Sequence, residues 1–111
     1  MRRTTLILVL LFAALPLTAR AQTGNAEAGR AKNSMCIGCH GIPMYHTAFP
    51  EVYSVPKIAG QSPEYIIKAL QEYRAGDRSH PTMRAIARRL TDQDMADLAA
   101  YYGAMVKEAA K

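Results

Sequence analysis

The stretch Cys36-Ile37-Gly38-Cys39-His40 decides how the rest of this chain is interpreted. Two cysteines separated by two residues and followed directly by histidine are the signature for covalent attachment of a c-type haem. The spacing suits the chemistry, because two thiols one helical turn apart can add to the two vinyl groups on one porphyrin edge. The adjacent imidazole can then turn onto the iron. The motif predicts one covalent haem c held by Cys36 and Cys39, with His40 as the proximal iron ligand.

Two other chemistries use closely spaced cysteines. A redox-active Cys-x-x-Cys of the thioredoxin kind sits at a strand-to-helix junction of a βαβ chain, and the sequence shows no Val/Ile-rich parallel strand. A zinc site needs four ligands, and the histidines at 40, 46 and 80 lack the usual paired spacing. A disulfide within the motif would close a tiny loop and constrain little of the unfolded chain. The motif and its context favour haem.

The N-terminal segment indicates export. Met1-Arg2-Arg3 is followed by an apolar run over residues 6–17 and then by Ala19-Arg20-Ala21. These are the basic, hydrophobic and small-residue parts of a secretory signal peptide, so we predict cleavage after Ala21 and a periplasmic protein without a membrane span. Retention of residues 1–21 as an anchor is the alternative, although the apolar run is shorter than the roughly 20 residues that cross a bilayer.

Length and composition describe one small globular domain, predicted over residues 22–111. The chain has 111 residues, of which 50% are hydrophobic and 21% charged, which argues against intrinsic disorder. Its formal charge of +5 belongs largely to residues 1–21, whose removal leaves 11 basic against 9 acidic side chains. A near-neutral domain loses the compositional support for nucleic-acid binding, which depends on a dense basic surface.

Cap residues and breakers predict short helices over the rest of the chain. Each predicted start has a side chain that can accept hydrogen bonds from the first N–H groups of a helix. The helices are expected from Ala26 towards Cys36 after Asn25, from Pro63 to the stop at Gly76 after Ser62, and after Thr91, where Asp94 completes a capping box. Apolar residues of the last helix recur at helical spacing at Met95, Leu98, Tyr102, Met105 and Val106. No convincing strand periodicity is visible, so we predict an all-α fold.

Beyond the cysteine motif, several segments resemble the class I cytochromes c of the small bacterial mono-haem type. They are VPKIAGQ at 55–61, YRAGDR at 73–78, HPTM at 80–83, LTDQD at 90–94 and LAAYY at 98–102. The resemblance implies a cytochrome c fold of about three to five short helices wrapped around the haem, which supplies much of the core. It also implies that the first and last helices cross near Gly29 and the Tyr101-Tyr102 pair, and that Ile58 packs against the porphyrin.

Seven side chains are candidates for the sixth iron position: Met35, Met44, Met83, Met95, Met105, His46 and His80. The first two methionines flank the attachment site too tightly to reach the opposite haem face, and the last two belong to an apolar helix stripe. Met83 is expected in a loop behind Pro81 and matches the sixth-ligand segment of the resembled family. We therefore predict Met83 as the second axial ligand, with His80 as the next choice.

These assignments predict an electron carrier and not an enzyme. With both axial positions filled, the iron has no open site for a substrate and can only change oxidation state. We expect a monomer that exchanges electrons with donor and acceptor proteins. One alternative is a haem subunit of an exported dehydrogenase or oxidase, held through a patch at Met44, Tyr45 and Phe49. The other is a haem protein with an exchangeable sixth ligand.

Further haem contacts are less specific in the sequence. Gln61, Lys57, Tyr73 and Arg78 are candidates for bonds to the haem propionates, although solvated loops also carry such residues. The segment 42–53 is longer, more aromatic and poorer in glycine than the turn that follows the motif in the resembled family. Its apolar residues Phe49, Val52 and Tyr53 are candidates for covering one haem edge. We expect the carbonyl that accepts the His40 ring N–H near Pro43 or Pro50.

Overall fold

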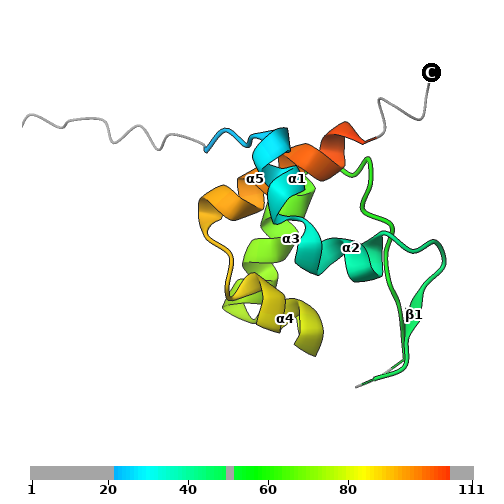
Figure 1. Ribbon diagram of the computed structural model, residues 1–111. Coiled ribbons are helices and arrows are strands. Elements are labelled where there is room, and N and C mark those ends of the chain that lie inside the picture. Colours follow the sequence, from blue (N-terminus) through cyan, green and yellow to red (C-terminus); the bar gives the residue numbers. More distant parts are fainter. Residues whose placement is uncertain (1–21, 50–51, 106–111) are drawn as a thin grey trace, which may run out of the picture.

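Five α-helices and one two-stranded antiparallel ladder make up the residues that the computed structural model describes, 22–49 and 52–105 (Figure 1). The helices are α1 (Ala26–Lys32), α2 (Ser34–His40), α3 (Pro63–Ala75), α4 (Pro81–Ala87) and α5 (Asp92–Ala104). The strands are β1 (His46–Thr47) and β2 (Tyr53–Ser54). The predicted signal peptide, residues 1–21, and the stripe position Val106 lie outside the described residues. The helices confirm the prediction of an all-α fold.

Hydrogen bonds at the caps confirm the predicted helix starts. The Asn25 side chain accepts from N–H groups in the first turn of α1, and Ser62 does the same for α3. Thr91 and Asp94 form the reciprocal capping box of α5. α3 ends at Gly76, whose φ of 99° lies in the left-handed region that favours glycine. Each N-terminal cap satisfies N–H groups that have no partner within the helix.

The first helix is shorter than predicted. We expected one helix over residues 26–36, but α1 and α2 are separated at Asn33, and the ribbon changes direction there (Figure 1). Asn33 is only 5% exposed, and its side chain does not cap α2. Instead, its Oδ1 accepts a hydrogen bond from the hydroxyl of Tyr102 in α5. A contact with a residue far away in sequence therefore interrupts a segment that local signals predicted as continuous.

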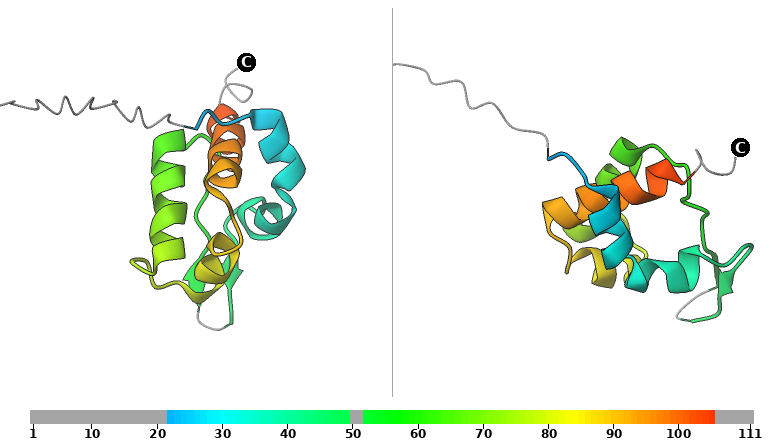
Figure 2. Two further views of the ribbon diagram at one scale, coloured as in Figure 1. Left: turned by 90° about the vertical axis from the view of Figure 1, so that its left-hand side faces the viewer. Right: turned by 45° about the horizontal axis from the view of Figure 1, so that its top comes forward.

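α5 lies between α1 and α3, so that the two terminal helices of the described chain are in direct contact (Figure 2). The closest approach is at Gly29, as the resemblance implied. A Cβ atom on Gly29 would lie 2.0 Å from the carbonyl oxygen of Asp97 and 2.8 Å from the Cβ of Tyr101. The core follows the same arrangement and comprises Ile66 and Leu70 of α3, Ala87 of α4, and Met95, Ala99 and Tyr102 of α5.

A short ladder interrupts the otherwise helical chain. β1 pairs with β2 in antiparallel register, with His46 opposite Ser54 and Thr47 opposite Tyr53. Each strand has two residues, which is too short for a visible alternation of apolar and polar residues. For this reason no strand signal is visible in the sequence. The ladder brings together the described parts of the unusual segment, residues 42–49 and 52–53, beside α2, and we call these residues the hairpin (Figure 1).

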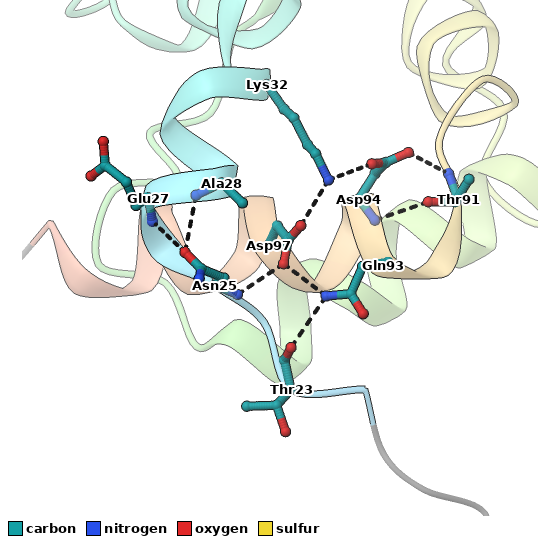
Figure 3. A network of polar contacts seen from close by, with 9 residues as sticks. All are labelled: Thr23, Asn25, Glu27, Ala28, Lys32, Thr91, Gln93, Asp94 and Asp97. Atoms are coloured by element: carbon teal, nitrogen blue, oxygen red, sulfur yellow. Dashed lines mark hydrogen bonds and ion pairs between the residues drawn. The ribbon is translucent and has the colours of Figure 1, made fainter.

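A polar network holds the N-terminal part of the described chain on α5 (Figure 3). Lys32 Nζ lies 2.7 Å from carboxylate oxygens of both Asp94 and Asp97. Asp97 is 3% exposed, and its Oδ1 also accepts from the backbone N–H of Asn25 and from the side-chain amide of Gln93. The Lys32 ammonium is the main cause of the lowered pKa values of both carboxyls, and the pKa of Asp94 falls to about 2. The buried carboxylate is thus fully partnered.

This network predicts a loss of stability in acid. Carboxyls with lowered pKa values stabilise the folded state above their unfolded pKa, near 4, and this contribution disappears as the pH falls through their folded pKa. We expect the free energy of unfolding of the holoprotein to decline between about pH 4 and pH 2. Lys32→Met should flatten this decline, whereas Arg30→Met, at an exposed position of the same helix, should leave it unchanged. Denaturant unfolding at a series of pH values measures both; equal slopes for wild type and Lys32→Met would contradict the assignment.

The close approach at Gly29 predicts a strong effect of a single methyl group. Gly29→Ala should reduce the free energy of unfolding by about 2 kcal/mol or more, because two backbones must separate to admit it. Gly38→Ala is the matched control, since it also lies in a helix but has open space around the added atom. Alanine favours helices over glycine, so the control should be neutral or slightly stabilising. Denaturant unfolding of both holoproteins provides the comparison, and equal losses would show that the crossing is not tight.

Candidate cofactor site

One cavity collects the side chains that the sequence selected for the cofactor. Its volume is about 700 Å³, within the range of pockets that bind organic ligands. Helices α2, α3 and α4 and the loop after β2 contribute to its wall. The selected residues on this wall are Cys36, Cys39, His40, Ile58, Gln61 and Met83. Three separate segments of the chain therefore bring the predicted ligands and contacts to one place.

The two motif cysteines are suited to forming thioethers with one porphyrin edge. Both are unpaired and half-buried, and their spacing of three places them as neighbours on one face of α2. Burial, with a smaller contribution from Cys39, raises the pKa of the Cys36 thiol, so that this thiol is held in its neutral form. Two adjacent thiols on one wall of a largely apolar cavity fit a covalently attached haem.

The His40 ring is oriented by a backbone carbonyl from a different loop. Its Nδ1 lies 2.7 Å from the carbonyl oxygen of Pro56. A carbonyl can only accept, so Nδ1 carries the proton and Nε2 is left with its lone pair for a metal. The expectation that this carbonyl lies near Pro43 or Pro50 is wrong. The pairing of β1 with β2 brings the chain back to the end of α2. Beside this ladder, the backbone N–H of Val55 donates to the carbonyl oxygen of Tyr45 at 2.8 Å.

We expected Met83 in a loop, but it lies in the first turn of α4. The helix begins at Pro81, whose fixed φ suits the first helical position. His80 is the N-cap, and its Nδ1 accepts the backbone N–H of Met83 at 3.4 Å. The His80 ring also makes an edge contact with Tyr53, with ring centroids 4.5 Å apart. Met83 is half-buried against the core and lines the cavity.

The structure reduces the candidates for the sixth position. Met35, His80 and Met83 line the cavity. Met95 is completely buried in the core, and Met44 is 90% exposed on the hairpin. Met105 and His46 are also absent from the cavity wall. Met35 shares its short helix with His40, and one ring nitrogen of His80 already caps α4. Met83 is therefore the candidate whose thioether comes from a different helix than His40.

Arg78 braces one side of the cavity. Its Nε donates to Glu72 Oε2 at 2.7 Å, and a terminal nitrogen donates to the Tyr65 hydroxyl at 3.3 Å. The guanidinium lies over the rings of Tyr65 and Tyr73, 5.6 and 5.5 Å from their centroids. The bond to Glu72 is the main cause of the raised pKa of Arg78. The guanidinium is thus a fixed positive charge on the cavity wall, as a propionate partner requires.

The other propionate candidates have fewer contacts that fix their side chains than Arg78 has. Tyr73, Lys57 and Gln61 also line the cavity. Gln61 uses its side-chain oxygen to accept the N–H of Ser62 at 3.0 Å, which leaves its amide nitrogen available as a donor. Lys57 is exposed at the cavity wall.

One contribution to the site was not visible in the sequence. The Pro56 carbonyl could not be found, because a backbone acceptor has no residue signature. Of the three apolar residues that were candidates for covering one haem edge, Tyr53 lines the cavity and contacts His80, whereas Phe49 and Val52 do not line it.

Most of the hairpin faces away from the cavity. Met44, Phe49 and Val52 are 90%, 87% and 76% exposed. Met44 also has a φ of 55°, which is unusual for a residue with a side chain. The hairpin therefore presents large apolar side chains at the surface, next to a wall that it builds with Thr47, Tyr53 and Ser54.

Two other structural features are absent from the described residues. Within residues 22–49 and 52–105, no group of three or more His, Cys, Asp or Glu side chains is placed to hold a metal ion. In the same part of the chain, none of the helices has the length and apolar character that a bilayer span needs.

Comparison with known proteins agrees with the geometry. A family model described as cytochrome c matches residues 26–103. A cytochrome c4 of Thiocapsa roseopersicina is 43% identical over 90 residues, which cover 80% of this chain and 44% of that protein. A cytochrome c4 of Pseudomonas aeruginosa is 38% identical over 97 residues, covering 86% and 46%. Cytochrome c-554(548) of Halomonas halodenitrificans is 38% identical over 82 residues, covering 71% of this chain and 94% of that protein.

The chain spans about half the length of the two cytochrome c4 relatives but nearly all of the shorter relative. The matched region contains the cysteine motif, the cavity and all five helices up to the last turn of α5. The fold is that of a cytochrome c, as the resemblance implied. This chain belongs to the cytochrome c family, and its cofactor is covalently attached haem c.

Proposed function

We propose that this protein is a periplasmic electron carrier whose haem iron is held by His40 and Met83. The observation that carries the proposal is that a preoriented imidazole and a half-buried thioether, from different helices, line one cavity together with the two attachment cysteines. The bound haem would supply reversible exchange of one electron between Fe(III) and Fe(II). The residues around it determine how readily that exchange occurs.

The chain contributes to the exchange through ligands and burial. The Pro56 carbonyl fixes the His40 ring and strengthens it as a ligand. Met83 offers a soft, neutral sulfur, which favours Fe(II) and raises the reduction potential. Apolar lining residues such as Ile58, Ile66 and Leu70 exclude water and disfavour the extra positive charge of Fe(III). With His40 and Met83 both holding the iron, no position would be open to a substrate, so the protein would act as a carrier and catalyse no bond chemistry.

The proposed location of the protein and the proposed limits of its domain both rest on the sequence. The basic, apolar and small-residue parts of residues 1–21 support export. We propose that the mature protein starts after Ala21 and forms one mono-haem domain. As a carrier it would be a monomer that binds a donor and an acceptor protein in turn.

A second candidate function is that of a haem subunit in a stable complex with an exported dehydrogenase or oxidase. The exposed apolar side chains of the hairpin favour it, because monomeric proteins rarely expose several large apolar residues together. Purification from the native host distinguishes the two. A carrier elutes as a monomer in size-exclusion chromatography, whereas a subunit co-elutes with one enzyme in a fixed ratio.

The sixth ligand is tested by absorption spectroscopy of holoprotein produced in a host that attaches haem c. We expect the ferric wild type to show the long-wavelength charge-transfer band of thioether ligation, and Met83→Ala to lose it completely while its reduction potential falls. Met35→Ala is the control, because Met35 also lines the cavity but lies on the helix of the proximal ligand. Loss of the band in Met35→Ala, or its absence from wild type, contradicts the proposal. A low-spin wild type without the band points to His80.

Arg78 should stabilise the holoprotein through its hydrogen bonds to Glu72 and Tyr65 and its stacking on aromatic rings. Lysine keeps the charge but cannot reproduce the planar contacts, so Arg78→Lys should reduce the free energy of unfolding of the holoprotein by about 1 kcal/mol. Arg88→Lys, at an exposed position after α4, provides the control and should change little. Denaturant unfolding followed by haem absorbance measures the difference; equal values for the two variants would show that Arg78 is not a brace.

A further inference from the structure

Asn33 uses its side chain in an unusual way for a residue at the start of a helix. Asparagine at this position normally accepts an N–H from the first turn of its own helix. Here no such bond is made. The Oδ1 atom accepts instead from the Tyr102 hydroxyl, 69 residues further along the chain. The stabilisation that a local cap would give α2 is replaced by a contact with α5.

The backbone of Asn33 is tied directly to the haem attachment motif. Its carbonyl accepts the N–H of Cys36 at 2.9 Å and the N–H of Ile37 at 3.1 Å. Because Asn33 is both the C-cap of α1 and the N-cap of α2, its position sets the end of α1 and the first turn of α2. Any displacement of Asn33 is therefore passed on to Cys36.

Tyr102 connects the same point to a second wall of the cavity. Its backbone carbonyl accepts the N–H of Gly60 at 2.8 Å, and Gly60 lies between the two loop residues Ile58 and Gln61, which line the cavity. Tyr102 itself is 4% exposed and also lines the cavity. One residue of α5 thus holds the start of the attachment helix through its side chain and the Ile58 loop through its backbone.

The Asn33 and Tyr102 groups are buried together, which makes their bond directional and costly to lose. Burial raises the pKa of the Tyr102 hydroxyl, so the phenol stays protonated and continues to donate. Without its partner, either polar group would be left unsatisfied in the interior. Leucine in place of asparagine and phenylalanine in place of tyrosine would remove both polar groups at nearly constant volume.

We propose that Asn33 and Tyr102 are positioning residues for the haem, whose hydrogen bond fixes the first turn of α2 and Cys36 relative to α5 and the Gly60 loop. The inference rests on the proposed function, since it concerns the environment of the redox-active haem. Loss of the bond lets α2 move against α5, which admits water to the cavity and favours Fe(III). The reduction potential therefore falls, although neither residue ligates the iron.

The test compares holoprotein variants by spectroelectrochemistry. Tyr102→Phe and Asn33→Leu should both have a lower midpoint potential than wild type. Imidazole, used as a probe of access to the ferric iron, should bind each variant about two- to tenfold more tightly, as expected for the loss of one hydrogen bond. Tyr101→Phe is the matched control, because it removes the hydroxyl of the adjacent tyrosine, which takes no part in this bond. Its potential and imidazole affinity should equal those of wild type.

The double variant Asn33→Leu/Tyr102→Phe separates positioning from simple stabilisation. Removing both polar groups should recover much of the stability lost in either single variant. The lowered potential should persist, because an apolar pair has no directional contact to fix Cys36. If the potential and the imidazole affinity of all three variants equal those of Tyr101→Phe while only stability changes, the bond merely supports the fold and the inference is wrong.

The midpoint potential tests the inference whichever ligand occupies the sixth position. A missing thioether band in wild type contradicts Met83 ligation, but it leaves the comparison between variants intact. Equal potentials in the presence of the band contradict the positioning role alone.

Discussion

The backbone of α1 lies directly on the backbone of α5 at Gly29, and the other elements take their places from this contact. Lys32 reaches Asp94 and Asp97 from the next turn of α1. One residue further, Asn33 meets Tyr102 and ends the helix. The attachment helix α2 therefore starts from a fixed point on α5. α3 packs on the other side of α5 and carries the opposite part of the cavity wall (Figure 2).

The features that the sequence predicted correctly have local causes. Asn25, Ser62 and Thr91 cap helices because their side chains reach N–H groups two or three residues away. The cysteine motif identifies its cofactor because the chemistry requires that spacing within one helical turn. The residues selected for the cofactor belong to segments that are individually recognisable in the sequence. The fold brings these segments together around one cavity.

The features that were missed depend on distant partners or on backbone atoms. The break at Asn33 is caused by Tyr102, and helix propensity contains no information about that contact. The acceptor for His40 is a carbonyl, which every residue possesses, and the hairpin that delivers Pro56 has strands too short to show a period. Met83 lies in a helix because Pro81 can begin one as well as stiffen a loop. From the sequence alone, Pro81 is compatible with either a loop or the first position of a helix.

The contact between α1 and α5 also constrains the order of assembly. It joins segments about 70 residues apart, as the bond from the Asn25 N–H to Asp97 shows, so loop closure over nearly the whole domain must precede its formation. During synthesis, α1 cannot make its contacts with α5 until α5 is present. The two cysteines are then on a segment that is still accessible to other molecules. A domain whose first helix packs on its last helix thus keeps the segment near its beginning open to covalent modification until the whole domain has been synthesised.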